Sequence, residues 1–215
     1  MPLHSGDALI LRTYKLAEAD RIVVFLTRDR GKKRGVAKGA RRPRSRFTGA
    51  LEPLTEVKVA YFEKEGRELV GINYAETVQS PLKLSGSALE HVGYFAELLD
   101  EWAQDADVDE RLFRLGTSIL DALITGAPVA PLARYFECWL LRLQGLYPEE
   151  RGGLSEGAQA FLAASRTLSP GRAAALPVGD GVLRELEETH RAQISMHLEK
   201  TLKSDRVLRE LRRHL

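Results

Sequence analysis

Basic side chains concentrate in one short stretch of the chain, from Arg28 to Arg46. This stretch holds ten Lys or Arg and one acidic residue, so its net charge is +9. The whole chain carries only +2, which leaves −7 on the remaining residues. Guanidinium groups hold phosphate oxygens in a two-pronged hydrogen bond, and Lys adds a mobile point charge. The stretch is therefore typical of a surface that binds the phosphates of nucleic acid.

Glycine and proline interrupt this stretch at Gly31, Gly35, Gly39 and Pro43. These residues disfavour a helix, and glycine lets a backbone approach a phosphate closely. We predict a short strand that leads into a basic loop. If the loop neutralises about six phosphates of a single strand, affinity should fall roughly 300-fold between about 50 and 200 mM salt. The predicted DNA-binding cations are Arg28, Lys32, Lys33, Arg34, Lys38, Arg41, Arg42, Arg44 and Arg46.

A charged stretch can also be a solvated loop without a partner. Self-repulsion among so many like charges opposes folding, which favours a polyanionic partner. Two neighbouring aromatic residues, Tyr14 and Phe47, are equally compatible with stacking on bases and with a place in the core.

Residue patterns for catalysis are absent from the sequence. Lys38 is followed by Gly39 and Ala40, where a phosphate-binding P-loop needs Lys and then Ser or Thr. The acidic pair Glu187 and Glu188 reads as a charged helical surface supported by neighbouring arginines, not as two catalytic carboxylates. We therefore expect a protein that is not an enzyme.

Metal ligands are equally sparse. The five histidines are scattered, and Cys138 is the single cysteine, flanked by apolar and aromatic residues that indicate a buried structural thiol. One thiol can form neither an internal disulfide nor a cysteine-rich zinc site. We expect no metal and no cofactor.

The basic loop must be held by β structure. Short apolar runs rich in β-branched residues, separated by turn formers, predict a small sandwich or barrel over residues 1–79. In one of these runs Val57, Val59 and Tyr61 alternate with residues of the other face, the period of a strand with one side in a core. The predicted strands are Ala8–Tyr14, Arg21–Thr27, Val57–Phe62 and Leu69–Tyr74.

From about residue 80 the pattern changes to helical spacing, so we predict a second, α-helical bundle domain over residues 80–215. The segment Ser169–Asp180, rich in Pro, Gly and Ala, is expected to be an exposed loop. The predicted helices are 89–102, Asp109–Thr125, Pro131–Leu146, Ser155–Ser165, Gly181–Leu202 and Asp205–His214. The fold class expected is α+β.

Neither a secretory start nor an apolar run of roughly 18 residues is present, so the protein is expected to be cytoplasmic, with no membrane partner.

Residues 6–57 strongly resemble the amino-terminal domain of the bacterial recombination-mediator family RecO. The resemblance rests on LAEAD before Arg21, GVAKGARRPRSRF at Gly35–Phe47 and ALEPL at Ala50–Leu54. Further on, Pro131–Pro148 is similar to the family's central helix, and Leu198–Leu211 is similar to its carboxy-terminal helix.

This resemblance implies an OB-fold barrel followed by an α-helical domain. It also implies a nucleoid-associated protein that binds single- and double-stranded DNA and anneals complementary strands. With the partner RecR, such a protein helps load the RecA recombinase onto DNA coated by single-strand-binding protein, whose acidic C-terminal tail it recognises. Many members carry a four-cysteine zinc module after the central helix, whereas this chain has no cysteine between Tyr147 and Ser155.

Two other classes of function are compatible with the same residues. An enzyme acting on nucleic acid would need clustered metal-binding carboxylates or a nucleophile with its base. A protein-binding adaptor would use the basic loop to hold an acidic partner, and its affinity for DNA would not increase with strand length.

Overall fold

The computed structural model describes residues 2–105, 107–147, 153–199 and 202–213. Contacts among the residues divide the chain into two compact units, 1–120 and 121–215. The five strands found among the described residues all lie in the first unit, and each unit contains one of the two tryptophans, Trp102 and Trp139. Within the described residues, no helix is both long and apolar enough to cross a bilayer.

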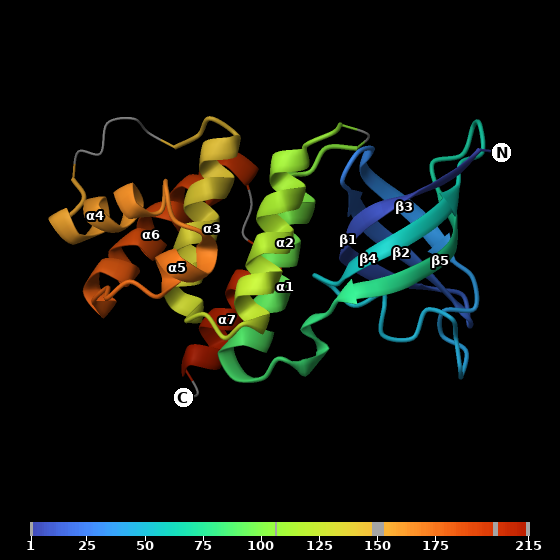
Figure 1. Cartoon of the computed structure of the whole chain (residues 1–215), viewed down its shortest axis with the longest axis horizontal. Coiled ribbons are helices and arrows are strands. Elements are labelled where there is room, and N and C mark those ends of the chain that lie inside the picture. The colour runs from blue at the N-terminus through green and yellow to red at the C-terminus, as the bar shows by residue number, and fades with distance from the viewer. Residues whose placement is uncertain (1, 106, 148–152, 200–201, 214–215) are drawn as a thin grey trace. The chain divides into compact units, whose positions relative to one another are not determined.

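The strands of the first unit close into a barrel in the order β1-β2-β3-β5-β4 (Figure 1). Every neighbouring pair is antiparallel except β3 and β5, which run parallel. This is the five-stranded OB-fold barrel, as predicted. The strands are β1 (Leu3–Leu16), β2 (Asp20–Thr27), β3 (Gly31–Ala37), β4 (Glu56–Phe62) and β5 (Val70–Gln79).

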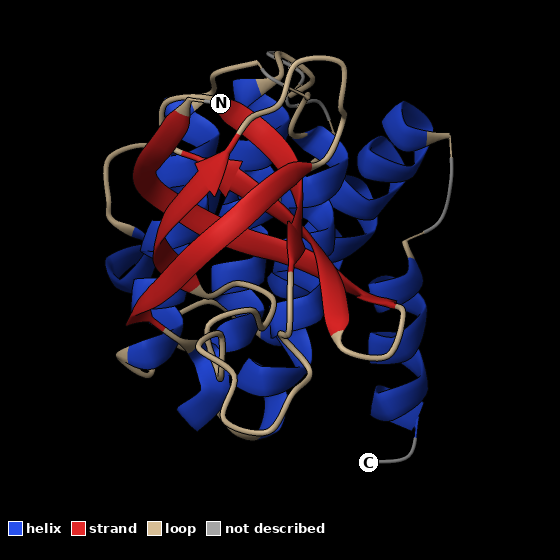
Figure 2. Ribbon diagram, turned by 90° about the vertical axis from the view of Figure 1, so that its right-hand side faces the viewer, coloured by secondary structure: helices blue, strands red, loops and turns tan. Residues whose placement is uncertain are grey.

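The four apolar runs are confirmed as β1, β2, β4 and β5, and the basic stretch supplies β3 as the predicted short strand. Inward-facing residues alternate along β4, where Val57, Val59 and Tyr61 are all buried. The Tyr61 ring meets Phe25 of β2 edge to face, with 5.6 Å between ring centroids. Figure 2 looks onto these strands as they cross one another around the core.

Gly35 lies where the barrel closes. The parallel contact between β3 and β5 is short, with only Gly35 opposite Val70 and Val36 opposite Gly71. A Cβ atom on Gly35 would stand 2.7 Å from Cγ1 of Ile72 and 2.8 Å from Cγ2 of Val70. The absence of a side chain at Gly35 therefore lets β3 approach β5 this closely.

Replacing Gly35 by alanine should destabilise the first unit by about 1–3 kcal/mol, because the added methyl overpacks the closure. The measurement is urea unfolding followed by Trp102 fluorescence in a Trp139→Phe background. Gly93→Ala is the matched control, since nothing lies within 4 Å of the added Cβ. This helical substitution should be neutral or stabilise by about 0.5–1 kcal/mol. Equal midpoints for the two variants would contradict the role given to Gly35.

Two helices complete the first unit. A short 3-10 turn, η1 (Pro81–Lys83), leads from β5 to α1 (Gly86–Trp102), which packs against β1. The next helix, α2 (Glu110–Ile124), comes close to β1 at Gly116. A Cβ atom on Gly116 would lie 2.6 Å from Cδ2 of Leu9. The compact unit thus extends to residue 120, and a domain boundary near residue 80 stays a prediction.

In the second unit, α3 (Val129–Leu143) packs against α5 (Pro170–Ala174) and α6 (Asp180–Leu198). The unit also holds α4 (Glu156–Ala164) and α7 (Lys203–Arg213). Cys138 of α3 is fully buried, which confirms the prediction of a structural thiol.

The prediction of an exposed loop over Ser169–Asp180 is wrong for its first half, which forms α5. Pro170 begins this helix because its fixed φ suits the first helical position. Ala173 and Ala174 are small enough to be buried where α5 meets α3.

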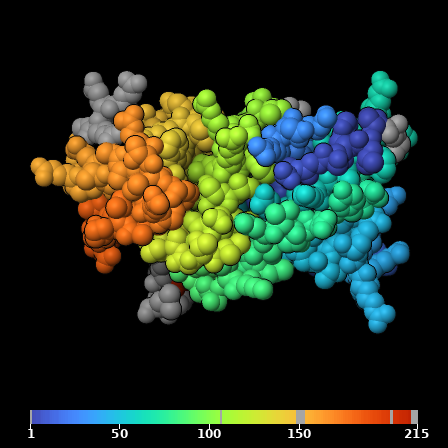
Figure 3. Space-filling model, viewed as in Figure 1, coloured from blue at the N-terminus to red at the C-terminus, as the bar shows by residue number. Residues whose placement is uncertain are grey.

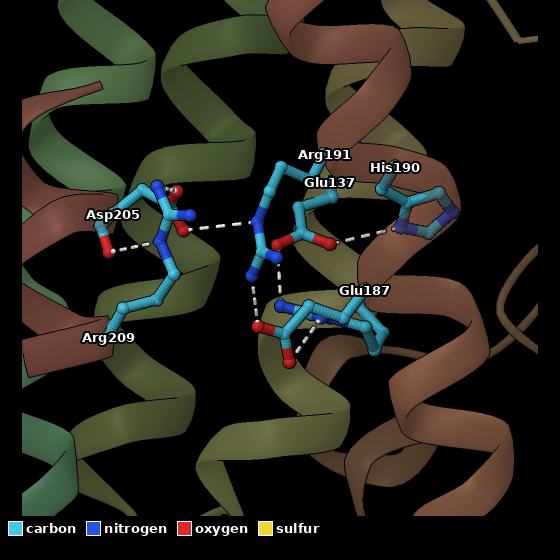
Figure 4. Close-up of polar contacts among 7 residues, drawn as sticks. Glu137, Glu187, His190, Arg191, Asp205 and Arg209 are labelled. Carbon is cyan, nitrogen blue, oxygen red and sulfur yellow. Dashed lines mark hydrogen bonds and ion pairs between the residues drawn. The ribbon is translucent and has the colours of Figure 1, made fainter. Parts of the chain in front are cut away.

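A network of charges crosses the second unit (Figure 4). Glu137 is 1% exposed; its Oε1 accepts a 2.7 Å hydrogen bond from Arg134, and its Oε2 lies 3.0 Å from Nδ1 of His190. The other ring nitrogen of His190 lies 3.2 Å from the Tyr147 hydroxyl. This network joins α3 to α6.

The network continues from α6 to α7. Glu187 pairs with Arg134 and Arg191, Arg191 reaches Asp205 at 3.3 Å, and Asp205 also accepts a 2.9 Å contact from Arg209. The side chain of Glu187 is 18% exposed. The predicted support from an arginine on the same helix is confirmed by the Glu187–Arg191 pair, and Arg134 of α3 adds a second partner that leaves Glu187 partly buried.

Glu137→Met should destabilise the second unit by about 3–5 kcal/mol, because buried donors of Arg134 and His190 lose their acceptor. Urea unfolding followed by Trp139 fluorescence, in a Trp102→Phe background, measures the change. The control is Glu210→Met, which removes a carboxylate 4.0 Å from Arg206 in a pair that is mostly exposed. That change should stay below about 1 kcal/mol. If both variants lose the same free energy of unfolding, the buried contacts of Glu137 stabilise the unit no more than an exposed ion pair does.

Candidate nucleic-acid interface

The loop after β3 is an ordered series of turns that is tied to the barrel at both ends. At its start, the Gly39 N–H donates to Asp20 Oδ1 at 2.8 Å, and the Arg41 N–H donates to the Ala19 carbonyl at 2.9 Å. At its end, Phe47, Ala50 and Leu51 are buried in the barrel core. The predicted basic loop is thus confirmed as a loop, and its cations lie between two fixed points.

The structure divides the nine predicted cations into two groups. Those of the first group have exposed side chains, and none makes an ion pair within the part of the chain that the structure describes. In Figure 3 the light-blue loop that carries most of them projects from the barrel. We call this group the exposed cations: Arg34, Lys38, Arg41, Arg42, Arg44 and Arg46.

Two of the exposed cations are oriented by local contacts. The Arg41 guanidinium donates to the Ala17 carbonyl at 3.0 Å. The Arg46 guanidinium lies over the Phe47 ring, 4.9 Å from its centroid. Phe47 itself is only 2% exposed, so it belongs to the core and offers no face to a base.

The second group consists of three cations that bind carboxylates of the same unit. Arg28 contacts Glu110 of α2 at 2.9 Å, and Lys33 contacts Glu63 at 2.8 Å. Lys32 is the most buried, with 11% of its side chain exposed. Its Nζ donates to the Asp100 carbonyl at 2.8 Å and lies 3.4 Å from Asp100 Oδ1, which ties β3 to α1.

These pairs lower the pKa of two carboxyl groups. The hydrogen bond from Lys33 is the main cause for Glu63, and hydrogen bonds from Arg28 and Arg114 are the main causes for Glu110. A lowered pKa means that the pair stabilises the folded chain above the ordinary glutamate pKa, and that this contribution is lost as pH falls through the lowered value. A phosphate that approaches Arg28 or Lys33 must therefore compete with a carboxylate that stays ionised.

Lys32→Met should lower the stability of the first unit by about 1–3 kcal/mol, because the Asp100 carboxylate loses a nearly buried partner. Arg42→Met, which removes an exposed cation, should leave stability unchanged within about 0.5 kcal/mol. Both midpoints are measured by urea unfolding with Trp102 fluorescence. If Lys32→Met unfolds at the same urea midpoint as wild type, the contact between Lys32 and Asp100 does not stabilise the first unit.

Sequence reasoning did not find a pocket of about 330 Å³ that lies between the barrel and α1. Its lining includes Tyr14 and Leu69, the cations Arg12, Lys32 and Arg34, and the carboxylates Asp100 and Glu101 of α1. Tyr14 is 47% exposed, and its hydroxyl accepts a 3.1 Å hydrogen bond from Arg12, which is itself held by Asp100 at 2.7 Å. Of the two aromatic candidates, Tyr14 is the one that presents a ring to solvent beside a cation.

The residues present do not fit a four-cysteine zinc module. Cys138, the single cysteine of the sequence, is buried within α3. Among the residues that the structure describes, no group of three or more His, Cys, Asp or Glu side chains is placed to hold a metal ion. Residues 148–152, in the segment that follows α3, lie outside the described residues.

Comparison with known proteins places this barrel and its basic loop in a family. The family model described as "Recombination protein O N terminal" matches residues 1–81, and the one described as "Recombination protein O C terminal" matches residues 84–164. The first match contains the whole barrel and all nine predicted cations.

Among curated proteins, the chain is similar to "DNA repair protein RecO" of Koribacter versatilis, with 39% identity over 149 residues. This match covers 68% of the chain and 61% of the relative. The protein of the same name from Anaeromyxobacter sp. strain K is 39% identical over 142 residues, or 65% of the chain and 56% of the relative. In Bifidobacterium adolescentis the identity is 53% over 78 residues, 36% of the chain and 31% of the relative. The chain thus spans about six-tenths or less of these relatives' lengths, and since both family models match it in order along residues 1–164, it belongs to the RecO family.

Proposed function

We propose that this protein is a DNA-binding recombination mediator that acts in DNA repair. The observation that carries the proposal is the set of exposed cations on β3 and the loop that follows it in an OB barrel. Its curated relatives bear the name "DNA repair protein RecO". A DNA partner of this kind would bring the protein to the nucleoid.

The exposed cations can act on two strands at once. Each cation that contacts a phosphate releases a condensed counterion, so binding is strong at low salt and weak at high salt. Two complementary strands repel each other through their phosphates, and a surface that neutralises both lowers that repulsion while their bases pair. Contacts to phosphates carry no sequence information, so annealing should depend little on sequence. This function needs no covalent bond to be made or broken, and it assigns the protein no catalytic residue.

The pocket beside Tyr14 supports binding to single strands in particular. An exposed aromatic ring next to Arg34 offers a stacking face and a phosphate contact together, the combination that OB barrels use for unpaired bases. Double-stranded DNA would bind through the exposed cations alone.

The proposal extends to partners named by the family resemblance. With RecR, the protein would help load RecA onto DNA coated by single-strand-binding protein. The acidic C-terminal tail of single-strand-binding protein ends in a carboxylate, which suits an apolar pocket rimmed by cations. We expect that tail to dock on the helical domain.

The test is the rate at which two labelled complementary strands anneal at low and moderate salt. A variant with Arg41, Arg42, Arg44 and Arg46 changed to Ala should lose the acceleration, and the slope of log affinity against log salt should become shallower by about 3. The matched control changes four cations of the second unit with exposed side chains, and should anneal like wild type: Arg166, Arg172, Arg184 and Arg206. Circular dichroism checks that both variants are folded.

Equal annealing by wild type and the folded loop variant would remove the loop from the mechanism. If wild type neither anneals nor binds DNA with an affinity that increases with strand length, the protein is instead an adaptor that binds acidic protein partners through the same cations.

A further inference from the structure

A second, larger pocket opens on the barrel where β3 meets β5. It has a volume of about 630 Å³. Val36, Phe62 and Leu69 give it apolar walls, and Lys38, Lys64 and Arg67 are the cations around it. Glu68 is the one carboxylate that lines it. We call this pocket the β3–β5 slot.

The slot follows from how the barrel closes. Because β3 and β5 pair over only two residues, the strands separate on either side of that contact. Between β4 and β5 the chain makes a turn, in which the Arg67 N–H donates to the Lys64 carbonyl at 3.1 Å. The side chains of Lys64, Arg67 and Leu69 on this turn are exposed, so the slot is open to solvent.

The lining selects the kind of molecule that fits. An apolar wall favours a flat organic group, and three cations against one carboxylate favour a negative charge beside it. A nucleotide unit of a single strand combines both features, since its base has an apolar face and its phosphate carries the charge.

The slot is also continuous with the proposed interface. Lys38 lines the slot and is the first of the exposed cations in the loop after β3. Leu69 lines both the slot and the smaller pocket that contains Tyr14 and Arg34. A single strand held by the loop can therefore run through the slot to the Tyr14 face without leaving the barrel surface.

We propose that the β3–β5 slot holds one unpaired nucleotide of single-stranded DNA, with its base against Val36, Phe62 and Leu69 and its phosphate near Lys64 or Arg67. This proposal rests on the proposed function and adds a subsite to it. A base in a duplex is stacked and paired, so it cannot enter the slot unless it is extruded. The slot therefore gives the protein a preference for single strands that the exposed cations by themselves do not provide.

Gly71 offers a way to fill the slot without changing its charge. It lines the slot on β5, and nothing lies within 4 Å of a Cβ atom built on it. Its φ is not in the left-handed region, so a side chain is accepted there without backbone strain. Gly71→Leu should place an isobutyl group in the slot and leave the barrel folded. Thr77→Leu is the matched control, because Thr77 is an exposed position of the same strand outside the slot.

The experiment measures the affinity of the full chain for an oligothymidine of about 20 nucleotides, longer than one OB barrel spans, and for a blunt hairpin duplex. Gly71→Leu should bind the single strand roughly tenfold more weakly and the duplex as wild type does, which reflects the loss of one base contact. The double variant Lys64→Glu, Arg67→Glu should likewise bind the single strand more weakly than wild type does. A fluorescent adenine analogue placed in the oligonucleotide should report an unstacked base with wild type and with Thr77→Leu, and a weaker signal with Gly71→Leu.

Three results would overturn the proposal. In the first, folded Gly71→Leu binds the single strand as tightly as wild type does. In the second, Gly71→Leu loses affinity for the single strand and for the duplex by the same factor. The third is a slot that takes an acidic, carboxylate-ended peptide, shown by peptide binding that Gly71→Leu abolishes while single-strand affinity is kept. In all three, wild type still binds DNA and the loop variant still loses that binding, whereas failure of the proposed function would appear as no DNA binding by wild type.

Discussion

The short parallel contact between β3 and β5 is the constraint on which the rest of the first unit depends. It closes the barrel and buries Ile10, Phe25 and Tyr61 on the inside. It also sets the point where the chain leaves β3 and begins the basic loop. Because the contact covers only two residue pairs and needs a glycine, the strands diverge around it and leave the β3–β5 slot. Closure of the core and shape of the outer surface therefore have the same cause.

Electrostatics divides the nine predicted cations between two tasks. Arg28, Lys32 and Lys33 face carboxylates brought by α1, α2 and the end of β4, and these pairs fasten the helices and strands of the first unit to one another. Of the exposed cations, Arg34 lies on β3 itself, and the other five lie farther along the chain, on the turns that follow the strand. A charge that lacks a carboxylate partner is free to meet a phosphate, whereas a paired one must first break a contact.

The second unit uses charge in a different way. Its network runs from Tyr147 and His190 through Glu137 and Arg134 to the pairs around Glu187 and Asp205. Several of these groups are buried, so each must keep its partner for the helices to pack. The directional contacts add to the apolar packing in setting the positions of α3, α6 and α7 within this unit.

Local patterns in the sequence determined most of the fold and the position of the basic loop. Alternating apolar residues predict strands such as β4, and glycines with Pro43 in a run of cations predict a strand that ends in a loop, because these signals act over a few neighbouring residues. The sequence motifs between Gly35 and Leu54 were also enough to indicate the protein family. Only the tertiary structure decided which cations are exposed, because Lys32 and Arg28 meet partners that lie 68 and 82 residues away. The partial burial of Glu187 beside Arg134 and the shape of the slot likewise arise where distant segments pack together, and no local spacing encodes such contacts.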